Sequence, residues 1–168
     1  MLTISLLTFL CFMIPFSGSA REYRIGGGPD GGTFIFFSKG ISEHASNKID
    51  GIDISVHPSG GSVDNLKMVN NREADFGITY SGDLYLGREG MLDRRGRQYR
   101  NVFAMAYLYG APAQLVVRKD SGINTIADLG FGKKVAVGGI GTGAATAAER
   151  LFRSMGVWRS MRPQYLGN

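Results

Sequence analysis

The stretch Gly26-Gly27-Gly28-Pro29-Asp30-Gly31-Gly32-Thr33 decides the fold, because it separates the extended run Tyr23-Arg24-Ile25 from an amphipathic helical run. Glycine lets backbone N–H groups approach a ligand without a Cβ in the way. The start of a helix adds unpaired N–H donors and the positive end of the helix dipole. A glycine turn between a strand and a helix is therefore suited to binding an anion.

Three more stretches repeat this arrangement further along the chain. They are Ser59-Gly60-Gly61-Ser62, Thr79-Tyr80-Ser81-Gly82-Asp83 and Gly138-Gly139-Ile140-Gly141-Thr142-Gly143. Alternation of strands and helices predicts an α/β fold with a largely parallel sheet. Ligands of such sheets bind beyond the carboxyl ends of the strands, so we expect the four loops to gather around one small acidic molecule.

Apolar periodicity predicts the remaining elements. Strands are expected at residues 52–56, 75–78, 134–137 and 163–166, and helices at 33–47, 62–70, 83–86 and 144–155, with a helical turn at 125–129. Two extended runs, 102–109 and 114–118, follow each other without a helix between them. Because a crossing between two lobes requires such runs, we expect the hinge there.

The same periodicity predicts which helix faces are buried. On the first helix the inward stripe is Phe37, Ile41 and Ala45. On the last helix the residues expected to point inward are Ala144, Ala147, Ala148, Leu151 and Met155, and those expected outside are Glu149, Arg150 and Arg153. Gly156 predicts the end of that helix.

The first twenty residues predict a secretory signal peptide rather than part of the fold. Residues 2–16 are apolar and uncharged, and Ser17-Gly18-Ser19-Ala20 supplies small residues for cleavage near Ala20. The alternative is a buried first helix or strand. Cys11 is the only cysteine and lies inside this segment, so the mature chain has no disulfide or thiol chemistry. We expect a periplasmic protein.

The net charge is +5, and much of the excess comes from residues 88–100, where Arg94-Arg95-Gly96-Arg97 is the densest part. Charge blocks of this kind are usually solvated surface loops, although anionic lipid or an acidic partner also fits. No aromatic platform interleaves with these arginines, and the protein is expected to be exported. We therefore expect no nucleic-acid partner.

The glycine loops do not predict a nucleotide cofactor. The first loop fits the dinucleotide pattern G-x-G-x-x-G, but Pro29 lacks an N–H and the second strand ends in His57 rather than an acid. Gly143 precedes Ala144 instead of the Lys-Ser/Thr of a phosphate loop. With two histidines and no mature cysteine, neither a metal site nor a catalytic set is expected. An exported enzyme acting on a small anionic substrate remains the alternative function.

Five blocks of the chain resemble the TAXI-type solute-binding proteins of TRAP (tripartite ATP-independent periplasmic) transporters. They are residues 27–34, Ser59-Gly60-Gly61-Ser62 continuing to 66, residues 73–78, residues 121–129, and residues 134–138 with Gly141-Thr142-Gly143. The chain departs from the family pattern at the last loop, where Thr142 replaces the usual serine and Ala144 the usual threonine.

This resemblance implies a two-lobed clamshell that captures a small carboxylate or amino acid and delivers it to TRAP membrane permease subunits. It implies binding rather than catalysis, with no cofactor. The solute would lie against Gly32, Thr33, Phe34, Ser59, Gly60, Gly61, Ser62, Tyr80, Ser81, Gly141, Thr142 and Gly143. Asn65 is expected to hold the second loop in place rather than to touch the solute.

The resemblance also sets the expected domain limits. Residues 1–20 form the signal peptide, 21–107 the first lobe without its returning strands, and 108–168 the hinge strands with part of the second lobe. A clamshell of this family sends its chain into the second lobe and back. We therefore expect this chain to be the amino-terminal portion of a longer protein, poorly soluble and weak in binding by itself.

Overall fold

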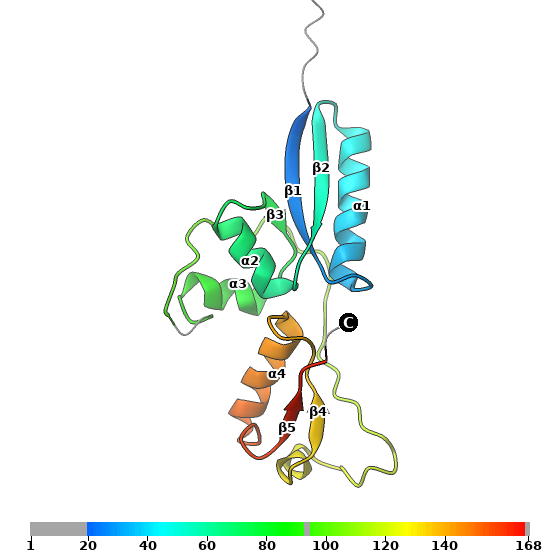
Figure 1. Ribbon diagram of the computed structural model, residues 1–168, viewed down its shortest axis with the longest axis vertical. Helices are drawn as coiled ribbons and strands as arrows, with labels where there is room; N and C mark the ends of the chain where they lie inside the picture. Colours follow the sequence, from blue (N-terminus) through cyan, green and yellow to red (C-terminus); the bar gives the residue numbers. More distant parts are fainter. Residues whose placement is uncertain (1–19, 93–94, 167–168) are drawn as a thin grey trace, which may run out of the picture.

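Two small parallel sheets organise the chain in the computed structural model (Figure 1), which describes residues 20–92 and 95–166. The expected signal peptide lies outside the described residues, except for Ala20. The elements in chain order are β1 (Arg21–Gly28), α1 (Thr33–Lys48), β2 (Ile52–Pro58), α2 (Ser62–Asn70), β3 (Phe76–Gly77), α3 (Ser81–Arg88), the 3-10 helix η1 (Ile126–Gly130), β4 (Lys134–Ala136), α4 (Gly143–Ser154) and β5 (Arg162–Gln164).

The first sheet has the strand order β2-β1-β3, with both pairings parallel. Ile25 is paired with Val56 on one side and with Phe76 on the other, so β1 is central. The α/β fold with parallel sheets predicted from the alternation of elements is confirmed. We call β1–β3 and α1–α3 the first lobe.

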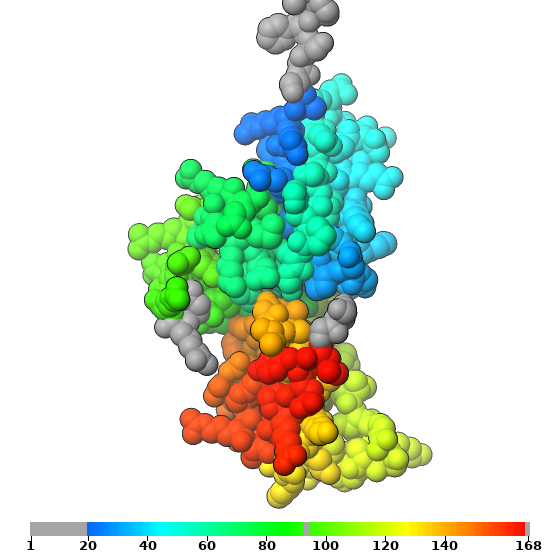
Figure 2. Space-filling model, viewed as in Figure 1, coloured from blue at the N-terminus to red at the C-terminus, as the bar shows by residue number. Residues whose placement is uncertain are grey.

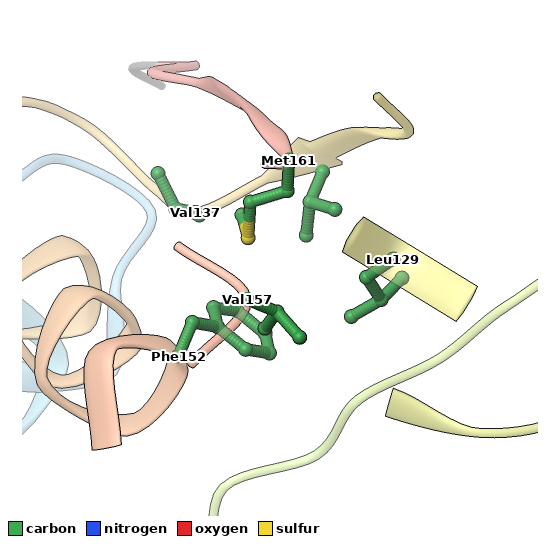
Figure 3. Close-up of a cluster of buried hydrophobic side chains, with 6 residues drawn as sticks. Leu129, Val137, Phe152, Val157 and Met161 are labelled. Carbon is green, nitrogen blue, oxygen red and sulfur yellow. The ribbon is translucent and has the colours of Figure 1, made fainter. Parts of the chain in front are cut away.

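The second sheet pairs β4 with β5 in parallel and carries α4 and η1. Its core gathers the buried side chains Leu129, Val135, Val137, Phe152, Val157 and Met161 (Figure 3). We call these elements the second lobe. Figure 1 shows it below the first lobe, with the start of α4 pointing toward the carboxyl ends of the first sheet.

A capping box begins η1. The Asp128 carboxylate accepts backbone N–H bonds from Asn124 at 2.9 Å and from Thr125 at 2.8 Å. These bonds stabilise the charged form and lower the pKa of Asp128 below its usual range. Hydrogen bonds among residues at the start of the predicted turn at 125–129 therefore stabilise it.

The predicted buried stripe of α1 is wrong. Phe37, Ile41 and Ala45 are only half-buried, and they line an open surface groove instead. The side of α1 that faces β2 carries serines, because Ser42 Oγ donates to the carbonyl of Ile54 while the Ile54 N–H donates to Ser46 Oγ at 3.0 Å. Strand β2 is at the edge of the sheet, and these hydroxyls satisfy its backbone groups there.

The predicted inward face of α4 is also wrong for most of its residues. Ala144, Ala147, Leu151 and Met155 are exposed, while Ala145 and Phe152 are buried. The two candidate stripes are adjacent on the helix and share Ala148, which does pack against the core. Burying the large Phe152 ring removes the most apolar area from water, and this decides how the helix is rotated.

The extended runs 102–109 and 114–118 were expected to be strands, and this is wrong for the part of the chain that the structure describes. Both runs are extended but belong to neither sheet. Val102 packs in the first lobe, whereas Met105, Tyr107 and Val116 are exposed. A strand exists only when its N–H and C=O groups find a neighbouring strand, and this segment crosses between the lobes with none.

No helix within residues 20–92 and 95–166 combines the length and the apolar content that crossing a membrane requires.

Replacing Gly40 by alanine is expected to raise the free energy of unfolding by about 0.5–1 kcal/mol. Gly40 lies inside α1, and a Cβ there would meet no atom within 4 Å. The comparison is Gly51→Ala, which also has open space but sits at φ +76° and should lose about 1 kcal/mol. Urea unfolding measures both, and a loss of stability in Gly40→Ala would contradict the prediction.

Candidate functional site

The four glycine loops meet at the carboxyl ends of β1, β2 and β3. The Ser59 N–H donates to the carbonyl of Gly28 at 3.2 Å, which joins the first two loops. The third loop joins them through the rings of Phe34 and Tyr80, whose centroids lie 5.2 Å apart. The fourth loop comes from the second lobe, where Gly143 packs against Tyr80. The gathering of these loops was predicted from the strand–helix alternation.

Hydrogen bonds to the side chain of Asn65, in α2, hold the loop Ser59-Gly60-Gly61-Ser62 in place. Ser59 Oγ donates to Asn65 Oδ1 at 2.6 Å, and Asn65 Nδ2 donates to the carbonyl of Ile78 at 2.7 Å. The Asn65 side chain is buried, so it fixes the loop and does not face a solute. This is the role the sequence indicated for Asn65.

Gly61 is the residue that gives this loop its shape. Its φ of +107° and ψ of −143° lie in a region that a residue with a Cβ rarely adopts. The Gly61 N–H donates to Ser59 Oγ at 3.1 Å. The neighbouring Gly60 N–H is directed at Asp64 Oδ2, 3.2 Å away, so an acid of the chain already occupies that donor.

Ser62 is bonded within the protein through its hydroxyl. Ser62 Oγ donates to Asp83 Oδ2 at 2.6 Å and accepts the Tyr80 N–H at 3.0 Å, with Thr79 Oγ1 2.9 Å away. Both Ser62 and Asp83 are buried. The predicted donor hydroxyl therefore joins α2 to α3, and Asp83 is a residue whose importance sequence reasoning missed.

In the second lobe, Thr142 caps α4. Its Oγ1 accepts the Ala145 N–H at 3.2 Å and donates to the carbonyl of Gly139 at 2.8 Å. Gly141 beside it adopts φ +82°. Thr142 thus serves as the N-cap of α4.

The start of α1 is the most available anion position in the first lobe. It is formed by Gly32, Thr33 and Phe34, has no side-chain cap and has no acid in its first turn. Thr33 is exposed there, as is Ser81 at the equally uncapped start of α3. By contrast, the first turns of α2 and α3 contain Asp64 and Asp83.

Tyr109 adds a second aromatic contact that the sequence did not indicate. Its ring stacks on Phe37 with centroids 4.9 Å apart and planes at 14°. Burial, and then the neighbouring Tyr80, raise the pKa of Tyr109 above its usual value. Tyr109 ends a long extended run, and no pattern in the sequence distinguishes it from Tyr107.

Two titratable side chains near the loops, Asp83 and His57, are bonded within the protein. The carboxylate nearest to a loop hydroxyl is Asp83, but its oxygens are bonded to Ser62 and to Arg150. His57 contacts Ser55 at 3.2 Å on the exposed end of β2. Over the described ranges, no three His, Cys, Asp or Glu side chains gather in a way that would hold a metal ion.

The model of the NMT1-like family matches residues 25–167 of the chain. The match covers both lobes and all four loops. With the geometry above, it establishes what kind of protein this is. The chain belongs to the NMT1-like family, a family of periplasmic solute-binding proteins.

Proposed function

We propose that this protein captures a small carboxylate or amino acid at the junction of its two lobes. The observation that carries the proposal is the meeting of four helix starts, three of them without a side-chain cap, at one end of the first sheet. Helix starts offer free N–H donors and a positive dipole end, which together favour an anion.

In this proposal the carboxylate accepts N–H bonds at the start of α1 from Thr33 and Phe34, beside Gly32, whose own N–H donates to the Pro29 carbonyl at 3.1 Å. The rings of Phe34 and Tyr80 flank the remainder of the solute. The second lobe approaches through the loop Gly141-Thr142-Gly143. Ser59 and Ser62 position the loop of the first lobe, and Gly60, Gly61 and Ser81 shape its wall.

We further propose that the protein is the TAXI-type component of a TRAP transporter and presents its solute to the membrane permease subunits. The blocks at residues 27–34 and 59–66 support this assignment, because they carry the resemblance to that group. The apolar segment 2–16 followed by small residues supports export through a cleaved signal.

The test places a negative charge where the carboxylate is expected. Thr33→Asp should weaken binding by about tenfold or more, since like charges a few ångströms apart repel. Thr33→Asn has the same size and no charge, and it is the matched control. An acid at the start of α1 favours the helix, so lost binding in Thr33→Asp does not report unfolding.

Thermal-shift titration with a panel of amino acids and of mono- and dicarboxylates provides the measurement. We expect at least one acid to raise the melting temperature of the wild type and of Thr33→Asn, but not of Thr33→Asp. Equal increases in melting temperature in all three proteins would show that the solute does not bind at the start of α1. A panel with no effect on the wild type would overturn the proposed function.

A further inference from the structure

An ion pair between Arg150 and Asp83 joins the two lobes. Arg150 Nη2 of α4 lies 2.7 Å from Asp83 Oδ1 of α3, although the two residues are 67 positions apart in the chain. The Asp83 side chain is 0% exposed and that of Arg150 is 39% exposed. The second terminal nitrogen of Arg150, Nη1, is also buried, with no hydrogen-bond partner in the described parts of the chain. The guanidinium is therefore held inside the contact between the lobes.

The pair continues into the loops of the proposed site. The other oxygen of Asp83 accepts the Ser62 hydroxyl at 2.6 Å, and Ser62 in turn accepts the Tyr80 N–H. A chain of bonds thus runs from the end of the first sheet through Asp83 to the middle of α4. The two bonds to the Asp83 carboxylate, 2.6 Å from Ser62 Oγ and 2.7 Å from Arg150 Nη2, have the short lengths typical of hydrogen bonds to a charged group.

Burying a carboxylate is costly unless a cation and hydrogen bonds compensate it. Asp83 obtains its cation from the other lobe. When the lobes separate, Asp83 keeps Ser62 but loses Arg150, so separation leaves an acid without its positive partner. An ion pair within one lobe has no such dependence on how the lobes are placed.

We propose that Asp83 and Arg150 form a latch that stabilises the docked arrangement of the two lobes. Neither residue has to touch the solute. The consequence for binding rests on the proposed function: a solute held by both lobes requires them to be docked, so weakening the latch lowers the apparent affinity by the fraction of docked molecules lost.

The chain provides a matched control on the same helix. Arg153 makes an ion pair with Glu149 at 2.7 Å, one turn along α4 and on its exposed side. Both partners belong to the second lobe. Arg153→Gln therefore removes an arginine and an ion pair of similar length without affecting the contact between the lobes.

The experiment measures the distance between the lobes without any solute. Spin labels on Asn47→Cys in α1 and Met155→Cys after α4, in a Cys11→Ser background, report that distance by double electron–electron resonance. Both positions are exposed. For Arg150→Gln we expect longer distances and a separated population raised about fivefold or more. Arg153→Gln should match the unsubstituted protein, and Arg150→Lys should restore part of the docked population.

The double variant Asp83→Asn/Arg150→Gln should separate the lobes no more than either single variant, because one interaction is being removed. If Asp83→Asn does not fold, the two Arg150 variants and the Arg153 control decide the matter alone. Distances in Arg150→Gln identical to those of the unsubstituted protein, or equal opening in Arg153→Gln, would overturn the latch. Failure of the carboxylate screen would overturn only the proposed function.

Discussion

Replacing Phe152 by alanine is expected to lower the free energy of unfolding of the second lobe by about 3–5 kcal/mol. Phe152 is 3% exposed and packs among Val137, Val157 and Met161 (Figure 3). The second lobe has two strands of three residues each, and a cluster this small holds little stability in reserve. We therefore expect the lobe to unfold while the first lobe stays folded.

Leu151→Ala is the control for Phe152→Ala, because the two residues are neighbours on α4 and differ in burial. Leu151 is 39% exposed, so its truncation should change stability by about 0.5 kcal/mol or less. Hydrogen exchange across residues 134–164, with β1 amides as the internal reference, measures both variants. Comparable loss of protection in Leu151→Ala would show that α4 is rotated differently from the structure.

Replacing Gly143 by alanine is expected to separate the lobes without unfolding either of them. A Cβ at this position would lie 2.5 Å from Tyr80 Cδ2 and 2.7 Å from Ser62 Cβ, both in the first lobe. Contacts this short force a shift that typically costs about 1–3 kcal/mol. Within its own lobe the substitution is harmless, because alanine favours a helix more than glycine does.

Gly82→Ala tests whether any alanine near the loops has this effect. Gly82 lies in the first turn of α3, and a Cβ there meets nothing within 4 Å. X-ray scattering of the two variants should show a larger radius of gyration for Gly143→Ala only, with circular dichroism unchanged in both. A radius unchanged in Gly143→Ala would mean that α4 does not dock on Ser62 and Tyr80 in solution.

The close contact between α4 and the first lobe explains why a larger residue at Gly143 would separate the lobes. Figure 2 shows atoms of α4 directly against the green and cyan atoms of the first lobe. Because Gly143 has no side chain, the start of α4 approaches Tyr80 and Ser62 through its backbone, and a Cβ at this position would occupy the contact. The glycine loop of the second lobe therefore contributes to the docking of the lobes.

Local chemistry explains which elements the sequence predicted well. Helix α2 covers Ser62–Asn70 as expected, since a glycine turn precedes it and its apolar residues recur at helical spacing. Helix α4 ends at Ser154, and Gly156 follows with φ +75°, as a helix stop requires. These features depend on residues close together in the chain.

Features that depend on distant residues were predicted less well. The buried face of α1 is set by the edge of β2, and the rotation of α4 by competition between Phe152 and Leu151 for one core. Arg150 was expected to face solvent, and only the docking of the lobes brings it to Asp83. Helical periodicity cannot choose between two adjacent stripes, and it carries no information on a partner 67 residues away.

The same distinction between features set by nearby residues and features set by distant residues applies to the candidate site. The sequence indicated which loops gather, because the carboxyl ends of parallel strands share one edge. It did not indicate that the hydroxyls of Ser62 and Thr142 are bonded within the protein, since a serine beside a glycine turn suits a cap and a ligand equally well. Among the predicted site hydroxyls, Thr33 and Ser81 are exposed at helix starts.

Within residues 20–92 and 95–166, one segment crosses between the lobes, and this tether makes their docking a matter of effective concentration. Beyond Tyr109, which stacks on Phe37, the chain belongs to neither sheet until it reaches η1. A short tether holds two partners at a concentration on the order of millimolar, so even a weak contact such as that of α4 with Ser62 stays largely formed. Proteolytic cleavage between Gly110 and Thr125 would turn docking into a bimolecular equilibrium, and at micromolar protein the lobes would part.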